Sequence, residues 1–507
     1  MRILLCRPLG DRGGRRVLAS TRGLVQASDR RPEGSSSSSR SSARHVHAGL
    51  ASRGRHRARL SQSPSCTYGA RRMRALRLAF RFVHIAIVVT IAVLDYAFRR
   101  LGKGRLDRAG LEGLRGERLA ALMERLGATF IKFGQIMSTR PDLLGPGYTQ
   151  KLARLQDAVP PAPFTAVEAV IAHELSAEAR ARLVSIDPTP VAAASVAQVH
   201  KATLDTGEIV ALKVQRPEAE AQIERDLAIL GILARLVDRL PSVHLLSIPG
   251  AVDRFAESLR GQLDFRREAE NNRRFAENFT SVPAVGVPRL FPDLCTRRVL
   301  GMEFVDGAKA SDHERIRGDR KELARVGGKA ILQMVFLDGF VHADLHPGNI
   351  LLTDDRVILI DLGMVTEIPP DLRRPWVETF IALSQSDGVK AAELFYGYAP
   401  SVGETRYAEF ERDVSENLGK LAGKSLGEVE VGEAVSGMMN VLRRHRVQVD
   451  PTFTVVHIAL LVAEGLGKQL DPEIDMVGLA VPYLMQAMTA APPARLPARE
   501  PPRALPA

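Results

Sequence analysis

Apolar residues recur at helical spacing over much of the chain. Between residues 118 and 138 they fall every three or four positions, which predicts an amphipathic helix, and Lys132 and Gln135 lie away from its apolar stripe. Further helical patterns cover residues 218–274 and 369–490. We therefore expect helices at both ends of the folded chain and over a long segment in its middle.

Two other regions show the alternation expected of strands. Residues 191–201 and 208–214, joined by a short turn, predict an antiparallel hairpin in which Lys213 faces the side opposite its apolar neighbours. A shorter hairpin is predicted from residues 349–352 and 357–360, on either side of a polar turn. This second hairpin would place Asp361 beside Asp344.

An uncharged apolar run occupies residues 82–94, provided that His84 is neutral. A helix of this length spans roughly 20 Å, less than the ~30 Å hydrocarbon core of a bilayer. We therefore expect residues 76–101 to form a buried or interfacial helix rather than a transmembrane span, with arginine-rich flanks suited to an anionic membrane surface. Residues 476–491 are also uncharged, but the segment is short and contains Pro482, so we expect a core helix there.

Composition is that of an ordinary globular protein, with 507 residues of which 45% are hydrophobic and 25% charged. This length allows two or three packed units. Cys6, Cys66 and Cys295 are far apart and lack C-x-x-C spacing. The cysteines therefore predict neither a disulfide framework nor a zinc site, and they favour a reducing compartment.

The net charge of +12 comes from one end of the chain. Residues 1–74 hold 17 arginines, no lysine and three acids, so the rest of the chain is close to neutral. This segment is rich in Arg, Ser and Gly without sustained periodicity, and we predict that it is disordered. It is either a transit peptide or, as we favour, an extension upstream of a later start at Met73. The charge therefore gives no support to nucleic-acid binding.

The candidate chemistry lies between residues 341 and 363. His342, Asp344 and Asn349 have the polar spacing of a kinase catalytic loop, and D-L-G at 361–363 follows the predicted hairpin. Phosphoryl transfer requires hard oxygen ligands for Mg²⁺ and a carboxylate near the attacking hydroxyl. We therefore predict that Asn349 and Asp361 hold the metal and that Asp344 acts as the base or orients the nucleophile.

The hairpin around Lys213 carries V-A-L-K, where kinases have V-A-I-K, so Lys213 is predicted to contact the α- and β-phosphates of ATP. The loop expected over the phosphates consists of Ala192, Ala193, Ala194 and Ser195, where kinases have glycines. A Cβ atom restricts positive φ and the close approach of backbone to phosphate, so the nucleotide geometry is expected to be unusual. Backbone groups from Glu303 to Val305 are predicted to hold the adenine.

Lys213 needs a glutamate as its ion-pair partner. Glu268 is one candidate, but it follows Lys213 by more residues than is usual in kinases. Glu218, Glu220 and Glu224 are therefore rivals on the residues alone.

Together these motifs resemble the UbiB-like (AarF-type) family of atypical kinases, which supports isoprenoid quinone (ubiquinone) biosynthesis. The features that carry the likeness are K-x-G-Q at 132–135 followed by S-T-R-P-D, the alanine-rich loop, V-A-L-K-V-Q-R-P, and H-A-D-L-H-P-G-N with D-L-G. They cover about residues 76–490. The resemblance selects Glu268 as the partner of Lys213.

The resemblance implies an α+β, protein-kinase-like bilobal fold with a small β-rich N-lobe, a helical C-lobe and an N-terminal helical extension. The implied divisions are a basic tail at 1–74, the extension at 75–185, the N-lobe at 186–306, the C-lobe at 307–491 and a disordered Pro-rich tail at 492–507. In the family the extension crosses the active site, where a protein kinase binds its peptide, and Lys132 and Gln135 belong to that extension.

The implied function is ATP binding with Mg²⁺, followed by slow hydrolysis or by phosphorylation of a small or lipid-linked substrate rather than a protein. The implied partners are a quinone-precursor lipid or quinone-biosynthesis enzymes and a peripheral membrane surface. The implied location is the cytoplasm at the membrane, or the mitochondrion if the N-terminus is a transit peptide. Two departures from the family are that its E-x-D motif appears here as Q-L-D at 262–264 and that no membrane span is evident near the C-terminus.

Two other functions remain open. A small-molecule phosphotransferase of the aminoglycoside or choline kinase type has a similar catalytic loop, but it assigns no role to Lys132 and Gln135. A scaffold switched by nucleotide would hold biosynthetic enzymes without catalysis, although the presence of every phosphoryl-transfer residue counts against a dead pseudokinase.

Overall fold

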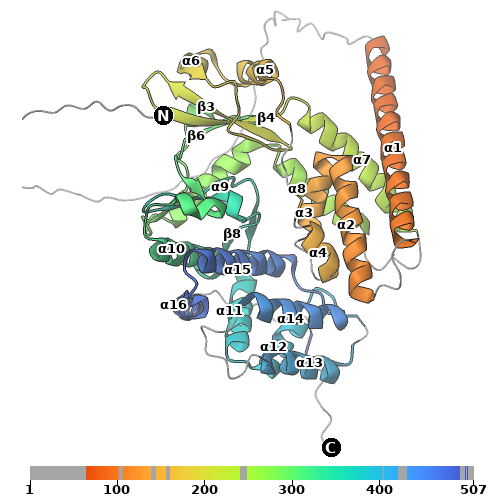
Figure 1. The fold of residues 1–507 in the computed structure, drawn as a ribbon, viewed down its shortest axis with the longest axis vertical. Helices are drawn as coiled ribbons and strands as arrows, with labels where there is room; N and C mark the ends of the chain where they lie inside the picture. Colours follow the sequence, from red (N-terminus) through yellow and green to blue (C-terminus); the bar gives the residue numbers. More distant parts are fainter. Residues whose placement is uncertain are drawn as a thin grey trace, which may run out of the picture. The chain divides into compact units, whose positions relative to one another are not determined.

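The computed structural model describes residues 64–101, 107–138, 144–152, 154–155, 160–239, 248–403, 405–420, 431–490, 497 and 499–500. All of them belong to one compact unit, Pro64–Ala507. Helices predominate (Figure 1), and the strands among the described residues form sheets of five, four and two strands. Of the tail predicted at 1–74, residues 1–63 lie outside the described residues.

The chain begins with four helices, which are α1 (Pro64–Leu101), α2 (Arg108–Leu126), α3 (Ala128–Ser138) and α4 (Pro146–Leu152). The prediction of one helix over 118–138 is wrong, because the helix breaks at Gly127. Gly127 has φ 95°, a conformation that favours glycine, and its N–H caps α2 by bonding to the carbonyl of Met123. Ile85, Met123, Leu126 and Phe130 form the buried core that joins these helices.

Helix α1 differs from the prediction in two ways. It starts at Pro64, inside the segment predicted to be a disordered tail. Its apolar part, Leu76–Leu101, has 26 residues, and an 18-residue window within it has a mean hydropathy of 2.1 and is 6% buried. By length and composition this helix could cross a membrane, whereas the prediction considered only the shorter uncharged run at 82–94. At 1.5 Å per residue this part is about 39 Å long. One other helix among the described residues, α15 (Pro451–Leu470), has comparable length and character, but half of it is buried.

The first lobe is built on an antiparallel sheet with the strand order β1-β3-β4-β6 and β2 added beside β3. The strands are β1 (Leu183–Ile186), β2 (Ala192–Ala193), β3 (Ala197–Leu204), β4 (Ile209–Gln215) and β6 (Val299–Glu303). The predicted hairpin around Lys213 is confirmed as β3 and β4, with Val199 opposite Lys213. Helices α5 (Phe164–Glu174) and α6 (Ala177–Ala181) pack on this sheet, so the predicted domain boundary at 185 divides a packed unit.

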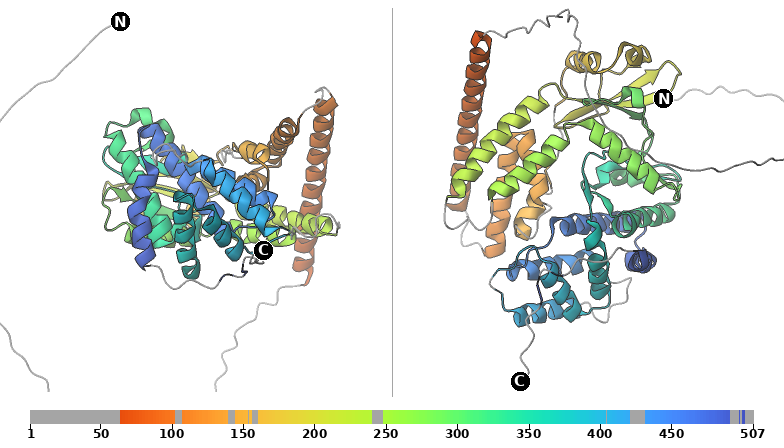
Figure 2. Two further views of the ribbon diagram at one scale, coloured as in Figure 1. Left: turned by 90° about the horizontal axis from the view of Figure 1, so that it is seen from below. Right: turned by 180° about the vertical axis from the view of Figure 1, so that it is seen from behind.

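Two helices are inserted between β4 and the helix that carries Glu268. They are α7 (Ala219–Val237) and α8 (Ile248–Gly261), and α9 (Phe265–Asn278) follows. Both inserted helices lie beside the N-terminal helices, with α1 along the outer edge (Figure 2). The insertion explains why 55 residues separate Lys213 from Glu268.

The second lobe contains the two motifs of the catalytic region. Strands β5 (Val285–Gly286), β10 (Val357–Leu359), β9 (Ile350–Leu352) and β7 (Ala308–Lys309) form one sheet, and β8 (Phe340–His342) pairs with β11 (Val365–Glu367). The predicted second hairpin is confirmed as β9 and β10. Its helices are α10 (Arg320–Leu332), α11 (Pro370–Ser384), α12 (Gly388–Tyr398), α13 (Tyr407–Gly419), α14 (Val431–Arg444), α15 and α16 (Met476–Ala490).

The C-terminal residues that the structure describes contact the second lobe. The guanidinium of Arg499 donates hydrogen bonds to the carbonyl oxygens of Ala399 and Pro400. The predicted disorder from residue 492 onward therefore does not hold for this residue.

Candidate active site

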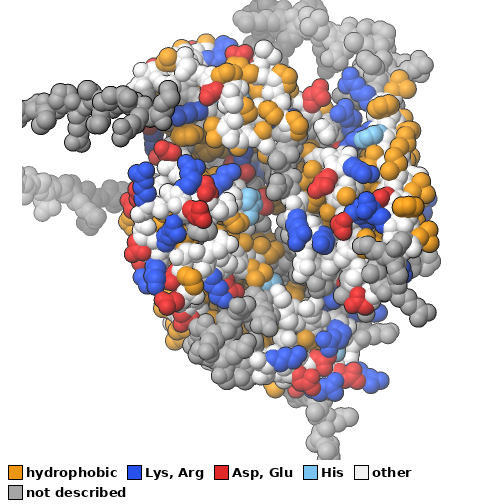
Figure 3. Space-filling model, in the orientation of Figure 1, with side chains coloured by type: hydrophobic (Ala, Val, Ile, Leu, Met, Phe, Trp, Pro, Cys, Tyr) orange, Lys and Arg blue, Asp and Glu red, His pale blue; other side chains and the backbone are white. Residues whose placement is uncertain are grey.

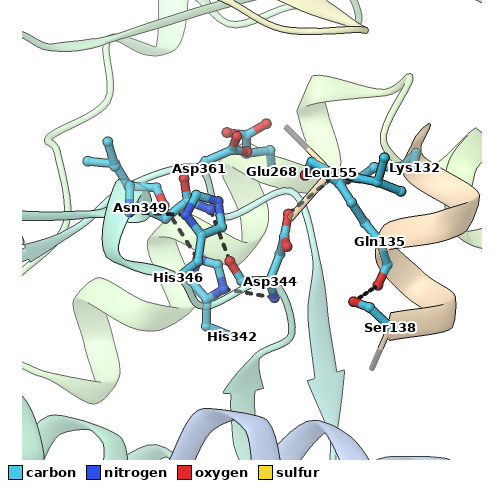
Figure 4. A network of polar contacts seen from close by, with 12 residues as sticks. Lys132, Gln135, Ser138, Leu155, Glu268, His342, Asp344, His346, Asn349 and Asp361 are labelled. Carbon is cyan, nitrogen blue, oxygen red and sulfur yellow. Dashed lines mark hydrogen bonds and ion pairs between the residues drawn. The ribbon is translucent and has the colours of Figure 1, made fainter. Parts of the chain in front are cut away.

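Two short paired strands bring the catalytic-loop motif and the D-L-G motif together. β8 ends at His342, which lies opposite Val365 of β11. The pairing continues beyond the strands, because the N–H of Ala343 bonds to the carbonyl of Met364 at 3.0 Å. Asp344 follows β8 and Asp361 precedes β11, so the pairing of these strands brings the two aspartates to the same region (Figure 4).

Asn349 and Asp361, the predicted metal ligands, lie on adjoining segments, because the N–H of Ile360 bonds to the carbonyl of Asn349 at 2.9 Å. The amide nitrogen of Asn349 donates to the carbonyl of Asp344 at 3.0 Å, which directs its side-chain oxygen elsewhere. Asp361 has φ 56°, an uncommon conformation for a residue with a side chain, and 49% of its side chain is exposed. An exposed carboxylate and a free amide oxygen have the chemistry that Mg²⁺ prefers.

Asn349 and Asp361 alone would not complete the coordination shell of a metal ion. Among the described residues, no three His, Cys, Asp or Glu side chains are grouped to hold a metal ion. Mg²⁺ commonly binds through one or two protein oxygens together with substrate phosphates and water. The donor set therefore fits a metal that arrives with a nucleotide better than a permanently bound one.

Lys213 lies between two carboxylates. Its Nζ atom is 2.7 and 2.9 Å from the oxygens of Glu268 and 2.7 Å from Asp361 Oδ1. Burial alone would lower the pKa of Lys213, but the two acids raise it above its ordinary value. Burial raises the pKa of Asp361, yet the charge of Lys213 outweighs burial and holds that pKa well below normal. Lys213 and Asp361 are therefore both ionised at neutral pH.

The rival glutamates have other partners. Glu220 pairs with Arg297 and Glu224 pairs with Arg260, both at exposed positions. Glu218 precedes α7 and makes no side-chain capping bond. Glu268 is 5% exposed on α9, and burial raises its pKa. The structure thus brings Glu268 to Lys213, as the family resemblance implied.

Helix α9 also contacts the D-L-G segment directly. Asn271 Nδ2 donates to the carbonyl of Leu362 at 2.8 Å. Arg274 pairs with Glu367 of β11 at 2.9 Å, and its guanidinium lies 4.1 Å from the centre of the Phe340 ring. The sequence analysis did not identify Asn271 or Arg274. Glu268, Asn271 and Arg274 follow one another at intervals of three residues, a spacing that places them on the same side of α9.

Lys132 reaches the site from the N-terminal helices. Its Nζ donates to Asp344 Oδ2 at 3.1 Å, and the residue is 8% exposed although it lies away from the apolar stripe of α3. Burial alone would raise the pKa of Asp344, but the Lys132 charge keeps it below the ordinary value. Gln135 lies one turn further along, where its Nε2 donates to the carbonyl of Leu155 at 3.2 Å. Lys132, but not Gln135, therefore contacts an acid of the site.

His342 supports the loop rather than facing solvent. Its Nδ1 accepts the N–H of Asp344 at 3.2 Å and its Nε2 lies 3.4 Å from the carbonyl of Ile360, which assigns the proton to Nε2. Burial lowers its pKa, so the ring is neutral. His342 thus links the two halves of the motif.

Comparison with known proteins identifies the family. Residues 154–395 match the ABC1 atypical kinase-like domain, and residues 414–475 match the UbiB helical domain. The chain is 35% identical over 433 residues to a probable protein kinase UbiB from Pseudomonas paraeruginosa, covering 82% of this chain and 81% of the relative. It is 36% identical over 425 residues to a probable protein kinase UbiB from Aeromonas hydrophila, covering 80% and 78%.

This chain belongs to the UbiB family of atypical kinases. The family and the kinase-like α+β fold predicted from the sequence are thereby confirmed. Among solved structures, the chain is similar to Rv3197 from Mycobacterium tuberculosis, determined with erythromycin, with a TM-score of 0.48, 23% identity and coverage of 77% and 96%.

The nucleotide loop of this UbiB family member is a tight hairpin. β2 is only Ala192–Ala193, and the N–H of Ala194 bonds to the carbonyl of Ala197 at 2.8 Å. Ser195 is 8% exposed within that turn. Because Ala194 N–H is occupied, the loop has fewer free donors for phosphate than a glycine-rich loop would have.

The predicted adenine-binding segment follows β6. The N–H of Glu303 bonds to the carbonyl of Arg289 at 2.8 Å, and Glu303 is the last residue paired with β4. Val305 comes after the strand and is half-buried. These positions lie at the end of the last strand of the first lobe, and adenine binding by this segment stays a prediction.

The Q-L-D departure from the UbiB pattern lies at the start of α9. The carboxylate of Asp264 accepts the N–H of Arg266 at 3.1 Å and so caps the helix that carries Glu268. Gln262 has a buried Nε2 atom without a hydrogen bond in the structure. Asp264 therefore has a structural role as the cap of α9. Gln262 stands where the family has an acidic residue, and its amide nitrogen makes no hydrogen bond.

Proposed function

We propose that this chain is an ATP- and Mg²⁺-dependent atypical kinase or ATPase that supports isoprenoid quinone biosynthesis. Its acceptor would be a small or lipid-linked molecule, or water, rather than a protein. The observation that carries the proposal is the contact of Lys132 with Asp344, which places a residue of the N-terminal extension on the acid that would meet the nucleophile. The family membership supports the kinase-like chemistry.

Each residue would have a distinct part in the reaction. Lys213, positioned by Glu268, would bind the α- and β-phosphates of ATP, and the segment from Glu303 to Val305 would bind adenine. Asn349 and Asp361 would hold Mg²⁺, which neutralises charge that develops on the phosphoryl oxygens. Asp344 would orient the acceptor hydroxyl or water.

The geometry disfavours a protein acceptor. A peptide substrate must bring a hydroxyl to Asp344 along an extended surface, but α3 already supplies a buried side chain there. Only 33% of the Asp344 side chain is exposed. A small acceptor, or a lipid that presents one polar group, needs much less space.

Nucleotide binding and quinone levels test the proposal together. Purified full-length chain should bind Mg-ATP, and Asp361→Asn should lose Mg²⁺-dependent binding because a charged metal ligand becomes neutral. Asp354→Asn, an equivalent change in the exposed turn between β9 and β10, is the matched control and should bind as the wild type does. In a deletion strain with reduced quinone, wild type and Asp354→Asn should restore the quinone profile, whereas Asp361→Asn should not.

Two outcomes would redirect the proposal. If Asp361→Asn bound Mg-ATP normally, the metal assignment would be wrong. If Asp344→Asn bound nucleotide and restored quinone as well as the wild type, catalysis would be dispensable and the nucleotide-switched scaffold would be the better explanation.

A further inference from the structure

Helix α1 differs from a helix on the surface of a soluble protein, because two of its charged side chains face the protein body beside the buried Ile85 while many of its apolar side chains are exposed. At 100° per residue, Arg77, Arg81, Asp95 and Arg99 share a sector only about 40° wide. Arg81 and Asp95 use this sector to contact the protein body rather than solvent. Surface helices normally place apolar side chains inward and charges outward.

Two ion pairs fasten this sector to the body. Arg81 Nε is 2.7 Å from Asp226 Oδ1 of α7, whose side chain is fully buried, and Arg81 Nη2 donates to the carbonyl of Leu126 at 2.7 Å. Fourteen residues further on, Asp95 pairs with Arg118 of α2 at 2.9 Å. A buried aspartate that loses its arginine is costly, so α1 stays attached along its length.

Another side of α1, centred about 100° round the helix from the charged sector, is apolar and exposed. Phe80, Val83, Ile87, Ile91, Leu94 and Phe98, hereafter the outer stripe, follow each other at spacings of three and four and are 49–78% exposed. The stripe extends over about 27 Å. Orange side chains follow the outer edge of the molecule where α1 lies (Figure 3). An exposed apolar surface of this extent marks an interaction site.

The width of the apolar surface favours lipid over a second copy of the chain. Phe82, Val89 and Val93 lie beyond one edge of the outer stripe and are also exposed, so the uncharged surface covers about 200° of the helix circumference. A helix that pairs with one other helix needs only a narrow seam, which charged residues normally border. Contact over half of the circumference is what a hydrocarbon environment provides.

We propose that α1 lies flat in the interface of a phospholipid bilayer, with the outer stripe among the acyl chains. A spanning orientation is disfavoured because α2, which carries charged residues such as Arg118, is bound alongside α1 and would have to enter the bilayer with it. Arg99 and Arg100 in the last turn suit the phosphate level of the membrane. Membrane binding would thus keep the kinase-like body at the surface where lipid-linked acceptors lie.

The inference does not depend on the proposed chemistry. Full-length protein should float with phosphatidylcholine vesicles, and it should remain bound in high salt because the outer stripe carries no charge. The variant Ile87→Glu/Leu94→Glu should partition into these vesicles at least about tenfold less, since each change places a charge against the acyl chains. Asp361→Asn should float as the wild type does, which separates this test from that of the active site.

A matched control has the same charge change elsewhere. Val184→Glu/Val389→Glu alters two exposed valines outside α1, which are 68% and 57% exposed, and should float as the wild type does. Mg-ATP binding and thermal unfolding should be unchanged in both double variants, and a milder Leu94→Asn variant replaces the first if it fails to fold.

Four results would overturn the inference. The first is normal flotation of Ile87→Glu/Leu94→Glu. The second is flotation of the wild type only with anionic phosphatidylglycerol and only at low salt, which would assign binding to arginines. The third is a dimer in sedimentation velocity that this variant converts to a monomer, which would assign the outer stripe to a second copy. The fourth is resistance of the membrane-bound protein to alkaline carbonate, which would indicate a spanning helix.

Discussion

Lys213 and Lys132 both neutralise an acid of the site, but they belong to different parts of the molecule. Lys213 lies on β4, where strand pairing fixes its position, and it makes three contacts of 2.7–2.9 Å with two carboxylates. Lys132 lies on α3, outside the kinase-like lobes, and contacts Asp344 at 3.1 Å. Under the proposed function, Lys213 would build the nucleotide site, whereas Lys132 would limit what reaches Asp344.

The largest effect is expected at Lys213. Lys213→Met should lower the rate of ATP turnover by about a thousandfold or more, because the phosphates lose their cation and Asp361 loses the charge that keeps it ionised. It should also destabilise the fold by roughly 3 kcal/mol, since Glu268 is left buried without a partner. Turnover and denaturant unfolding measure the two effects. An equal loss of turnover in Lys132→Met would remove the distinction between the lysines.

Lys132 should affect the pH profile more than stability. The pKa of Asp344 is held low by Lys132 against burial. In Lys132→Ala this pKa should rise, so the acidic limb of kcat/KM for ATP turnover should move to higher pH, because Asp344 must be ionised to orient the nucleophile. A profile that keeps its acidic limb while only the maximal rate changes would show that Lys132 does not act through Asp344.

The smallest effect is expected at Asp338, which lies outside the contacts of Lys213 and Lys132 with acids of the site. Asp338 has a buried oxygen without a hydrogen bond, and burial raises its pKa to about 6. A folded-state pKa above the unfolded value means that the protein loses stability as the pH rises from about 4 to 6 and does not regain it above that range. Asp338→Asn should therefore raise the Tm by roughly 1–2 °C near pH 8 and leave it unchanged near pH 4. The same gain at both pH values would exclude ionisation as the cause.

The sequence predicts the residues of the site better than their surroundings. Lys213, Asn349 and Asp361 follow from local motifs, because a hairpin and a loop fix their positions within a few residues. Glu268 could not be chosen from spacing alone, because α7 and α8 are inserted before α9 and the rival glutamates lie at the start of α7. Only the resemblance to a family resolved that choice.

Periodicity has a further limit, which α1 and α3 share. It indicates which side chains face together, but not what lies opposite each face. On α3 the polar face meets Asp344 instead of water, and on α1 the charged sector meets α7 and α2 while the apolar side is exposed. Contacts between distant parts of the chain decide both cases, and a one-dimensional pattern does not contain them. Gly127 is different, since a glycine within a helical pattern was a visible signal for the break.

Helix α9 supports two parts of the site at once, namely Lys213 and the D-L-G segment. Glu268 and Asn271 stand one turn apart on the same helix, the first bound to Lys213 and the second to the carbonyl next to Asp361. A displacement of α9 would therefore remove the support of Lys213 and the support of the D-L-G segment together. If the proposed function holds, the phosphate-binding and metal-binding sides of the site would depend on the position of one helix.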